Sequence, residues 1–264
     1  EIYTLSLHDA LPISCVFFGQ LLAGIFLHSL FLLQGVPHLP VPGLILSGPL
    51  YRGGGSLFMP GLFALSLLLV GSAWCSHLCY LGVWDARAAD TGPRSGRGVP
   101  AFWRKVRWAM LVASLFLPLG LRLAGLPWPW ALVLALALGL ALLPCALWLS
   151  RRLGFPVYCC GICPLGLTAN LLARLSPWRL RRNGRCTGCG ACARVCRYGA
   201  LRLDGTGKVA GPDWRCTLCG DCMSVCRQEA LEIRCCGQAG AWVEQALICS
   251  LSVLHTLFLF MGRV

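Results

Sequence analysis

The sequence predicts an integral membrane, all-α helical bundle of about five transmembrane helices, with one small α+β domain near the C-terminus. Three observations predict this fold class. Hydrophobic residues make up 57% of the 264-residue chain, and charged residues make up only 12%, about half the usual share for a soluble domain. Long uncharged runs recur along the chain. Many of its 18 cysteines gather in two short runs after residue 184.

The first fourteen residues, EIYTLSLHDALPIS, are set apart from the rest. Segment 1–14 resembles the in-frame translation of a common sequencing-adapter oligonucleotide. We therefore expect the native chain to enter at about Cys15, the alternative being a natural polar leader. With this segment set aside, the sequence neither predicts nor excludes a signal peptide.

Five apolar segments predict the transmembrane helices, because about 20 apolar residues are needed to cross a bilayer. They lie at 15–36, 57–74, 108–124, 129–149 and 242–262. The third is the least regular, because Arg122 limits its uncharged part and Pro118 interrupts it. The first four belong to a predicted membrane domain at 15–183, and the fifth follows the cysteine-rich domain.

Arginine and lysine are unevenly distributed between the loops. Thirteen of them lie in 85–107 and 150–185, whereas the opposite loops hold only Arg52 and Arg122. The positive-inside rule places both basic loops in the cytoplasm, and alternation of four spans puts them on one side. We therefore expect a multi-pass protein of a bacterial inner membrane, with its cysteine-rich domain in the cytoplasm. The formal charge of +13 fits this orientation in membrane lipid, and no nucleic-acid partner is expected.

Two cysteine runs repeat each other at an offset of thirty residues: RCTGCGACARVCRYGAL (185–201) and RCTLCGDCMSVCRQEAL (215–231). In C-x2-C-x2-C-x3-C, three thiolates bind one cubic cluster and the fourth binds the other cluster. We therefore predict two [4Fe–4S] clusters. The first has the ligands Cys186, Cys189, Cys192 and Cys226, and the second has Cys216, Cys219, Cys222 and Cys196. Zinc is the alternative, but a zinc site takes only four ligands, usually as two separated pairs.

Over 184–234 the chain resembles the bacterial two-cluster ferredoxins. It departs from them at Arg197 and Arg227, which follow the fourth cysteine of each run where proline is usual. These arginines either favour the reduced, more negative clusters or are solvated surface charges.

Two shorter motifs, Cys75-x3-Cys79-Tyr80 and Cys159-x3-Cys163-Pro164, each follow an apolar span on the cytoplasmic side. With the spans and the two cysteine runs, they make the chain resemble the membrane-bound polyferredoxin family. This family includes the membrane ferredoxin subunit of periplasmic nitrate reductase systems and the electron-supply protein of nitrous oxide reductase. The resemblance covers about 57–234, although Tyr80 stands where the first motif expects proline.

The resemblance implies a membrane-bound electron-transfer component of an oxidoreductase system rather than a self-contained enzyme. Electrons would pass between a membrane quinol or a soluble donor and a partner oxidoreductase or its maturation machinery. Two alternatives are a stand-alone reductase of a small acceptor such as a metal ion, and an iron–sulfur sensor that regulates a partner. No nucleophile–base array, phosphate loop or HExxH motif occurs, so no catalytic residue is predicted.

The cysteines of the two shorter motifs have three interpretations: a further metal or cluster site, redox-active thiol pairs, or packing. We predict one redox or metal site, because packed helices bring such ends close together and an x3 spacing places both thiols on one helix face. Its residues are Cys75, Cys79, Cys159 and Cys163. A bound quinone is a further possible cofactor, and His77 is a candidate for tuning the first pair. Cys160 follows no pattern and is interpreted as packing.

Overall fold

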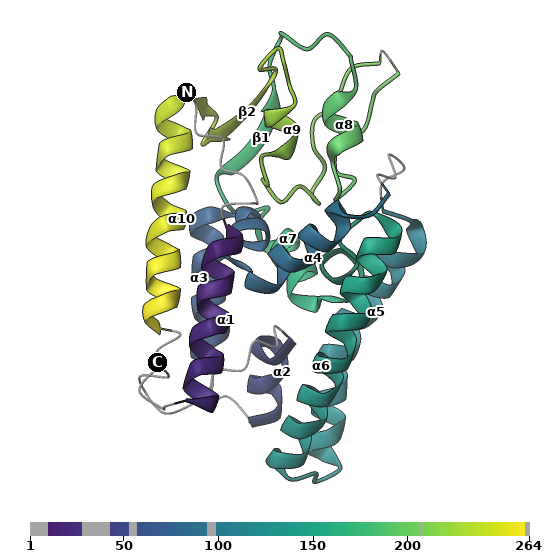
Figure 1. Cartoon of the computed structure of the whole chain (residues 1–264), viewed down its shortest axis with the longest axis vertical. Coiled ribbons are helices and arrows are strands. Elements are labelled where there is room, and N and C mark those ends of the chain that lie inside the picture. The colour runs from purple at the N-terminus through teal and green to yellow at the C-terminus, as the bar shows by residue number, and fades with distance from the viewer. Residues whose placement is uncertain (1–9, 28–42, 53–56, 94–98, 206, 262–264) are drawn as a thin grey trace.

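The structure is a computed structural model that describes residues 10–27, 43–52, 57–93, 99–205 and 207–261. The α-helices are α1 (Ala10–Phe26), α2 (Gly43–Arg52), α3 (Phe58–Val70), α4 (Tyr80–Asp90), α5 (Ala101–Leu123), α6 (Trp128–Leu153), α7 (Pro164–Leu172), α8 (Ala191–Val195), α9 (Asp221–Ser224) and α10 (Ala241–Met261). Single turns of π-helix are η3 (Trp74–Leu78) and η4 (Tyr158–Ile162). The strands are β1 (Trp178–Arg182), β2 (Leu231–Cys235) and β3 (Gln238–Ala239). The long helices extend away from one side of the small sheet domain (Figure 1).

Two helices among the described residues, α5 and α6, are long and apolar enough to cross a membrane. They contain 23 and 26 residues, and only 6% of the most apolar window of each is buried in the protein. Leu123 is 80% exposed and Leu140 is 69% exposed. An apolar helix that is exposed on most of its sides is suited to a lipid environment, whereas in water it would be an aggregation site.

The structure does not support the expected five transmembrane helices. Helix α3 has 13 residues, about 20 Å at 1.5 Å per residue, and ends at Gly71, whose φ of 62° turns the chain. The apolar parts of α1 and α10, Ser14–Gly24 and Ala241–Leu257, also fall short of a full span. Residues 28–36 of the first expected span lie outside the described residues. Apolar composition indicated these helices but did not show where each of them ends.

Helix α1 begins inside the segment that resembles a translated adapter. Its Ser14 is buried and donates a hydrogen bond to the Tyr80 carbonyl at 3.1 Å, while the Trp84 indole donates to Ser14 Oγ at 2.9 Å. The structure therefore packs α1 against α4 at this point.

The sheet domain has three antiparallel strands in the order β1-β2-β3. Trp178 pairs with Cys235 at one end of β1, and Arg182 pairs with Leu231 at the other. Strand β1 lies ahead of residue 184, where the sequence places the start of this domain. Buried residues of β1 and β2 belong to the same apolar cluster as residues of α3, α7 and α10, so one core joins the sheet to the helices.

Arg197 joins the sheet domain to the helical part. Its guanidinium forms ion pairs with Asp90 at the end of α4 and, at 3.6 Å, with Asp221 at the start of α9. Its side chain is only 15% exposed, so Arg197 is not a solvated surface charge. Arg227, thirty residues later at the matching position of the second run, is exposed.

We expect Arg197→Gln to destabilise the docked sheet domain by about 3 kcal/mol, because removing one partner of a largely buried ion pair leaves the other charge uncompensated. The matched control, Arg227→Gln, removes an exposed charge and should change stability by less than about 0.5 kcal/mol. Limited proteolysis of the sheet domain during a denaturant titration measures its stability in each variant. An equal loss of stability in the two variants would contradict this role for Arg197.

Candidate metal centres

The two cysteine runs fold into matching loops. Backbone φ is positive at Gly188 and Gly190 in the first run, and at Leu218 and Gly220 in the second. Glycine adopts this left-handed conformation without steric cost, whereas leucine adopts it rarely. Leu218 is buried in the core, and its carbonyl oxygen lies 3.1 Å from Nε2 of His77 in η3. Leu218, the only one of these four residues that is not glycine, therefore lies where the second loop contacts the helical part.

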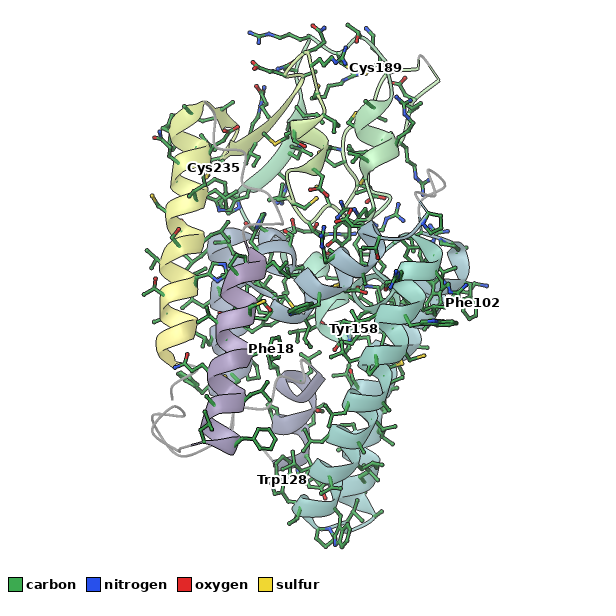
Figure 2. The ribbon with its side chains drawn as sticks, viewed as in Figure 1. Phe18, Phe102, Trp128, Tyr158, Cys189 and Cys235 are labelled. Atoms are coloured by element: carbon green, nitrogen blue, oxygen red, sulfur yellow. The ribbon has the colours of Figure 1, made fainter. Side chains whose placement is uncertain are left out.

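The eight cysteines of the runs gather around two separate cavities. Cys186, Cys189, Cys192 and Cys226 line the first, which we call the outer cysteine set. Cys216, Cys219, Cys222 and Cys196 line the second, which we call the inner cysteine set. Each set takes its fourth member from the other run, which is the grouping that crossed ligation requires. Cys189 lies at the end of the molecule farthest from the α5–α6 turn (Figure 2).

Backbone donors contact the fourth cysteine of each set. The N–H of Ala200 donates to Cys196 Sγ, and the N–H of Ala230 donates to Cys226 Sγ, both at 3.3 Å. Hydrogen bonds to ligating sulfur stabilise the thiolate and tune an iron–sulfur cluster. The residues present therefore fit a [4Fe–4S] cluster in each cavity.

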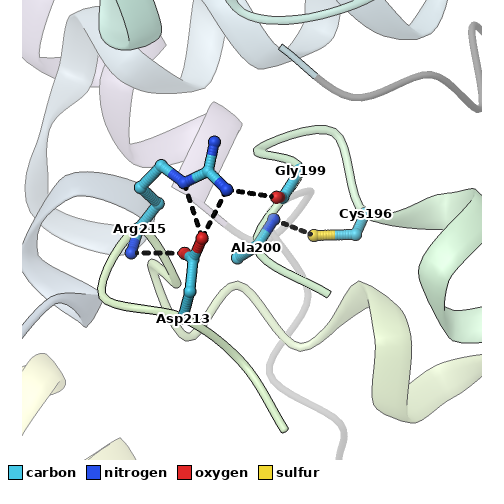
Figure 3. Close-up of polar contacts among 5 residues, drawn as sticks. All are labelled: Cys196, Gly199, Ala200, Asp213 and Arg215. Atoms are coloured by element: carbon cyan, nitrogen blue, oxygen red, sulfur yellow. Dashed lines mark hydrogen bonds and ion pairs between the residues drawn. The ribbon is translucent and has the colours of Figure 1, made fainter. Parts of the chain in front are cut away.

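An arginine–aspartate pair supports the loop that carries Cys196 (Figure 3). Arg215 Nε donates to Asp213 Oδ2 at 2.8 Å, and its Nη2 donates to the Gly199 carbonyl at 2.9 Å. Gly199 precedes Ala200, the donor to Cys196 Sγ. The pair thus fixes the backbone that presents the donor to the inner cysteine set.

The two cysteine sets differ in burial. Burial raises the pKa of Cys216 in the inner set to about 12. The backbone N–H groups of Gly188 and Val209 lower the pKa of Cys186, a half-buried member of the outer set. Binding of metal displaces these thiol protons, because only the thiolate is a ligand. Cys189 of the outer set is exposed, whereas every cysteine of the inner set is buried or half-buried. The outer cluster would therefore be reached from solution at Cys189.

The zinc alternative requires three or four ligands close to one ion, at about 2.3 Å for zinc–sulfur bonds. Within the described ranges, no group of three or more His, Cys, Asp or Glu side chains has such an arrangement. Thiolates at the corners of a cubic cluster lie farther apart, since each binds a different iron. Two sets of four cysteines, each drawn from both runs, are the grouping that two clusters require.

The cysteines of the two shorter motifs come together as well. Cys75, Cys79, Cys159 and Cys163 all line one cavity at the junction of the helices and the sheet domain. We call it the cysteine cavity. Cys160, which the sequence assigns to packing, also lines it.

Each shorter motif is a single π-helical turn, not the α-helix that the x3 spacing suggested. The N–H of Cys79 donates to the Trp74 carbonyl at 3.0 Å, and the N–H of Cys163 donates to the Tyr158 carbonyl at 2.7 Å. The second cysteine of each motif is extended, and α4 or α7 begins at the next residue. Pro164 suits a first helical position, and Tyr80 occupies the same position in the first copy. Such π-turns are frequent at functional sites.

Two glycines that the sequence analysis missed let the helix after each motif pack closely against the backbone of that motif. Gly82 and Gly166 each lie three residues after the second cysteine, at the same 84-residue offset as the cysteines. A Cβ on Gly82 would lie 2.7 Å from the Cys75 carbonyl oxygen, and one on Gly166 would lie 3.1 Å from the Cys159 carbonyl oxygen. The recurrence of Leu-Gly after each motif was the available signal.

Asp85, at the start of the segment that the sequence analysis treats as a basic loop, is fully buried. It accepts hydrogen bonds from Ser150 Oγ at 2.6 Å and from the N–H of Cys159 at 2.8 Å. Burial raises its pKa to about 6, although these hydrogen bonds oppose the shift. Asp85 therefore fastens η4 to α4 and places the second motif against the first.

Arg107 also lies inside the protein, with 8% of its surface exposed. With the Asn170 amide oriented so that its oxygen faces Arg107, the guanidinium donates to that oxygen at 3.2 and 3.3 Å, and Arg107 lines the cysteine cavity. None of the ion pairs in the described part of the chain involves it. Arg107 ends the basic segment 85–107 of the sequence analysis, where no motif distinguishes it from the other arginines. His77 contacts the loop of the inner cysteine set through the Leu218 carbonyl.

Comparison with family models gives two matches. Residues 185–237 match a 4Fe-4S dicluster domain, and residues 51–85 match a 4Fe-4S binding domain. The first match covers both cysteine runs, and the second contains Cys75 and Cys79. No curated protein and no solved structure matches the chain. The chain therefore carries an iron–sulfur domain of ferredoxin type, with a second 4Fe-4S segment ahead of α5.

We predict that Cys226→Ser damages the cluster of the outer cysteine set, although Cys226 belongs to the second run. The matched variant Cys196→Ser should damage the inner cluster. Selective ⁵⁷Fe Mössbauer and EPR spectra of the reduced protein distinguish the two losses. If Cys226→Ser removes the cluster held by Cys216, Cys219 and Cys222, the crossed assignment is wrong.

Proposed function

We propose that the protein is a membrane-bound iron–sulfur electron-transfer protein. It would pass electrons between a membrane quinol or a soluble donor and a partner oxidoreductase or its maturation machinery. The single observation that carries this proposal is the contiguity of its cysteine sites. Tyr198 and Thr217 line both the cysteine cavity and the cavity of the inner cysteine set, so one layer of side chains separates them.

The row of sites continues toward the bilayer. An apolar cavity between α2, α5 and α6 reaches from Trp128 to Tyr158, and Tyr158 also lines the cysteine cavity. Trp128, Tyr158 and Cys189 follow one another along the long axis of the molecule (Figure 2). A lipid-soluble donor in the apolar cavity would thus have a path to the outer cysteine set. We propose this order for the electrons.

We propose the bacterial inner membrane as the location. Arg104 and Lys105 lie at the start of α5, and Arg151 and Arg152 lie at the end of α6, which is the same end of this hairpin. The positive-inside rule favours the cytoplasm for this end and for the sheet domain next to it. The shorter apolar helices α1, α3 and α10 extend in the same direction as α5 and α6 (Figure 1), and we propose that they enter the same bilayer.

The surface near the outer cysteine set, where electrons would leave the protein, is basic. Exposed cationic side chains lie next to cysteines of the outer set along the chain: Arg185 precedes Cys186, Arg194 follows Cys192 by two residues, and Arg227 follows Cys226. Arg227 lines the cavity of this set. Charge complementarity favours an acidic soluble partner at this surface and would accelerate encounter at low ionic strength.

Reporter fusions test the proposed orientation. We expect a reporter placed after Gly154, at the end of α6, to be cytoplasmic, and one placed after Gly125, between α5 and α6, to be outside. Paired alkaline phosphatase and green fluorescent protein fusions report the two sides. The same side for both positions would show that the α5–α6 hairpin does not cross the membrane.

Reduction in proteoliposomes tests the electron-transfer proposal. We expect a reduced short-chain quinol to bleach the cluster absorbance once, with no further turnover until an acidic soluble acceptor is added. The turnover rate should then fall as salt is raised, because the encounter is electrostatic. Continuous turnover with a metal ion as the only acceptor would instead indicate a stand-alone reductase, and turnover that is independent of salt would contradict the basic docking surface.

A further inference from the structure

We propose that the cysteine cavity holds a third iron–sulfur cluster, bound jointly by both shorter motifs. Its ligands are Cys75, Cys79, Cys159 and Cys163. This inference rests on the proposed function and adds one centre to it. The family match at 51–85 supplies only two cysteines, whereas a [4Fe–4S] cluster takes four thiolates.

The missing pair comes from the second motif, 84 residues later in the chain. The Cys159 Sγ lies 3.5 Å from where a Cβ on Gly82 would stand, and Gly82 follows Cys79 by three residues. Asp85 of the same helix holds the N–H of Cys159. These contacts hold the two pairs of cysteines against each other, and the site needs both motifs.

The wall of the cavity contains buried polar atoms that lack a partner among the described residues. They are Trp74 Nε1, Arg107 Nε, Tyr198 Oη and Thr217 Oγ1. Leaving a buried polar group unsatisfied costs about 1–3 kcal/mol. Indole and guanidinium nitrogens only donate, and both hydroxyls are able to donate. The cavity is therefore built for an occupant that accepts hydrogen bonds, as cluster sulfides and ligating thiolates do.

Charge points to the same occupant. An oxidised [4Fe–4S] cluster with four thiolates has a net charge of about −2, because the four thiolates outweigh the core charge. Arg107 is a buried cation for which the described residues supply no ion pair, and burial of an unpaired charge is costly. A negative cluster beside it would offset this cost.

Other occupants fit less well. A single metal ion lacks the required close group of ligands among the described side chains. Simple packing of thiols accounts for neither the donors nor the arginine. Cys160 matches Ser76 in the first motif, so it stands outside the repeated ligand pattern. One-electron exchange is the reaction that such a centre supports: the cluster accepts one electron from the membrane donor and gives it to the inner cluster.

Iron content tests the third cluster. Anaerobically purified full chain should contain about 12 iron and 12 sulfide per molecule, and Cys159→Ser/Cys163→Ser should lose about four of each. The control, Cys145→Ser/Cys249→Ser, changes two exposed cysteines and should lose none. An unchanged iron content in the first double variant would overturn the proposal. The difference in iron content between the double variant and the unaltered chain tests the third cluster by itself. Absence of the outer and inner clusters would contradict the proposed function but not this inference.

A second measurement covers misfolding of the cysteine variant. Arg107→Gln removes the buried cation, so the third centre should keep its iron but be reduced only at a more negative potential. The exposed control Arg151→Gln should leave the potential unchanged. Redox titration followed by EPR separates the centres. A third signal whose potential is the same in Arg107→Gln as in the unaltered chain would overturn the inferred charge compensation, and the absence of any third signal would overturn the cluster.

Discussion

The hydrogen bonds between η3 and the loop of the inner cysteine set are the contact on which the remaining arrangement depends. Ser76 Oγ donates to the Thr217 carbonyl at 2.6 Å, and the His77 ring contacts the Leu218 carbonyl at 3.1 Å. These buried backbone carbonyls would be costly to leave unpaired. They hold the sheet domain in one position on the helices, and therefore keep the cysteine cavity and the inner set only one layer of side chains apart.

The sequence predicts the features that depend on local spacing. The thirty-residue repeat indicated the two groups of cysteines, because three ligands of each cluster lie only a few positions apart and the other run supplies the fourth. Helix ends were harder: nothing in the apolar run 57–74 shows that Gly71 turns the chain. Asp85 and Arg107 were also missed, because a charged residue between apolar runs is usually solvated. Their burial depends on packing between segments far apart in the sequence.

The two shorter motifs show how a site can be built by duplication without symmetry in every part. Gly82 and Gly166 make equivalent close approaches to the backbone of the preceding π-turn. Asp85, in contrast, has no equivalent, because Ala169 occupies its position in the second copy. Only the first copy therefore binds the other, through the hydrogen bond from the Cys159 N–H to Asp85. The repeated part supplies matching cysteines, and the unrepeated part fixes their relative position.

The crossed grouping of cysteines determines the order in which the sites can be completed as the chain is synthesised. The inner cysteine set has all its members once Cys222 has been made, whereas the outer set waits for Cys226, although its first three members are made earlier. The cysteine cavity is complete in its own thiols at Cys163 but gains its Tyr198 and Thr217 wall later. The outer set is therefore the last of the three groups of cysteines to be completed, and a chain truncated between Cys222 and Cys226 would lack a ligand only there.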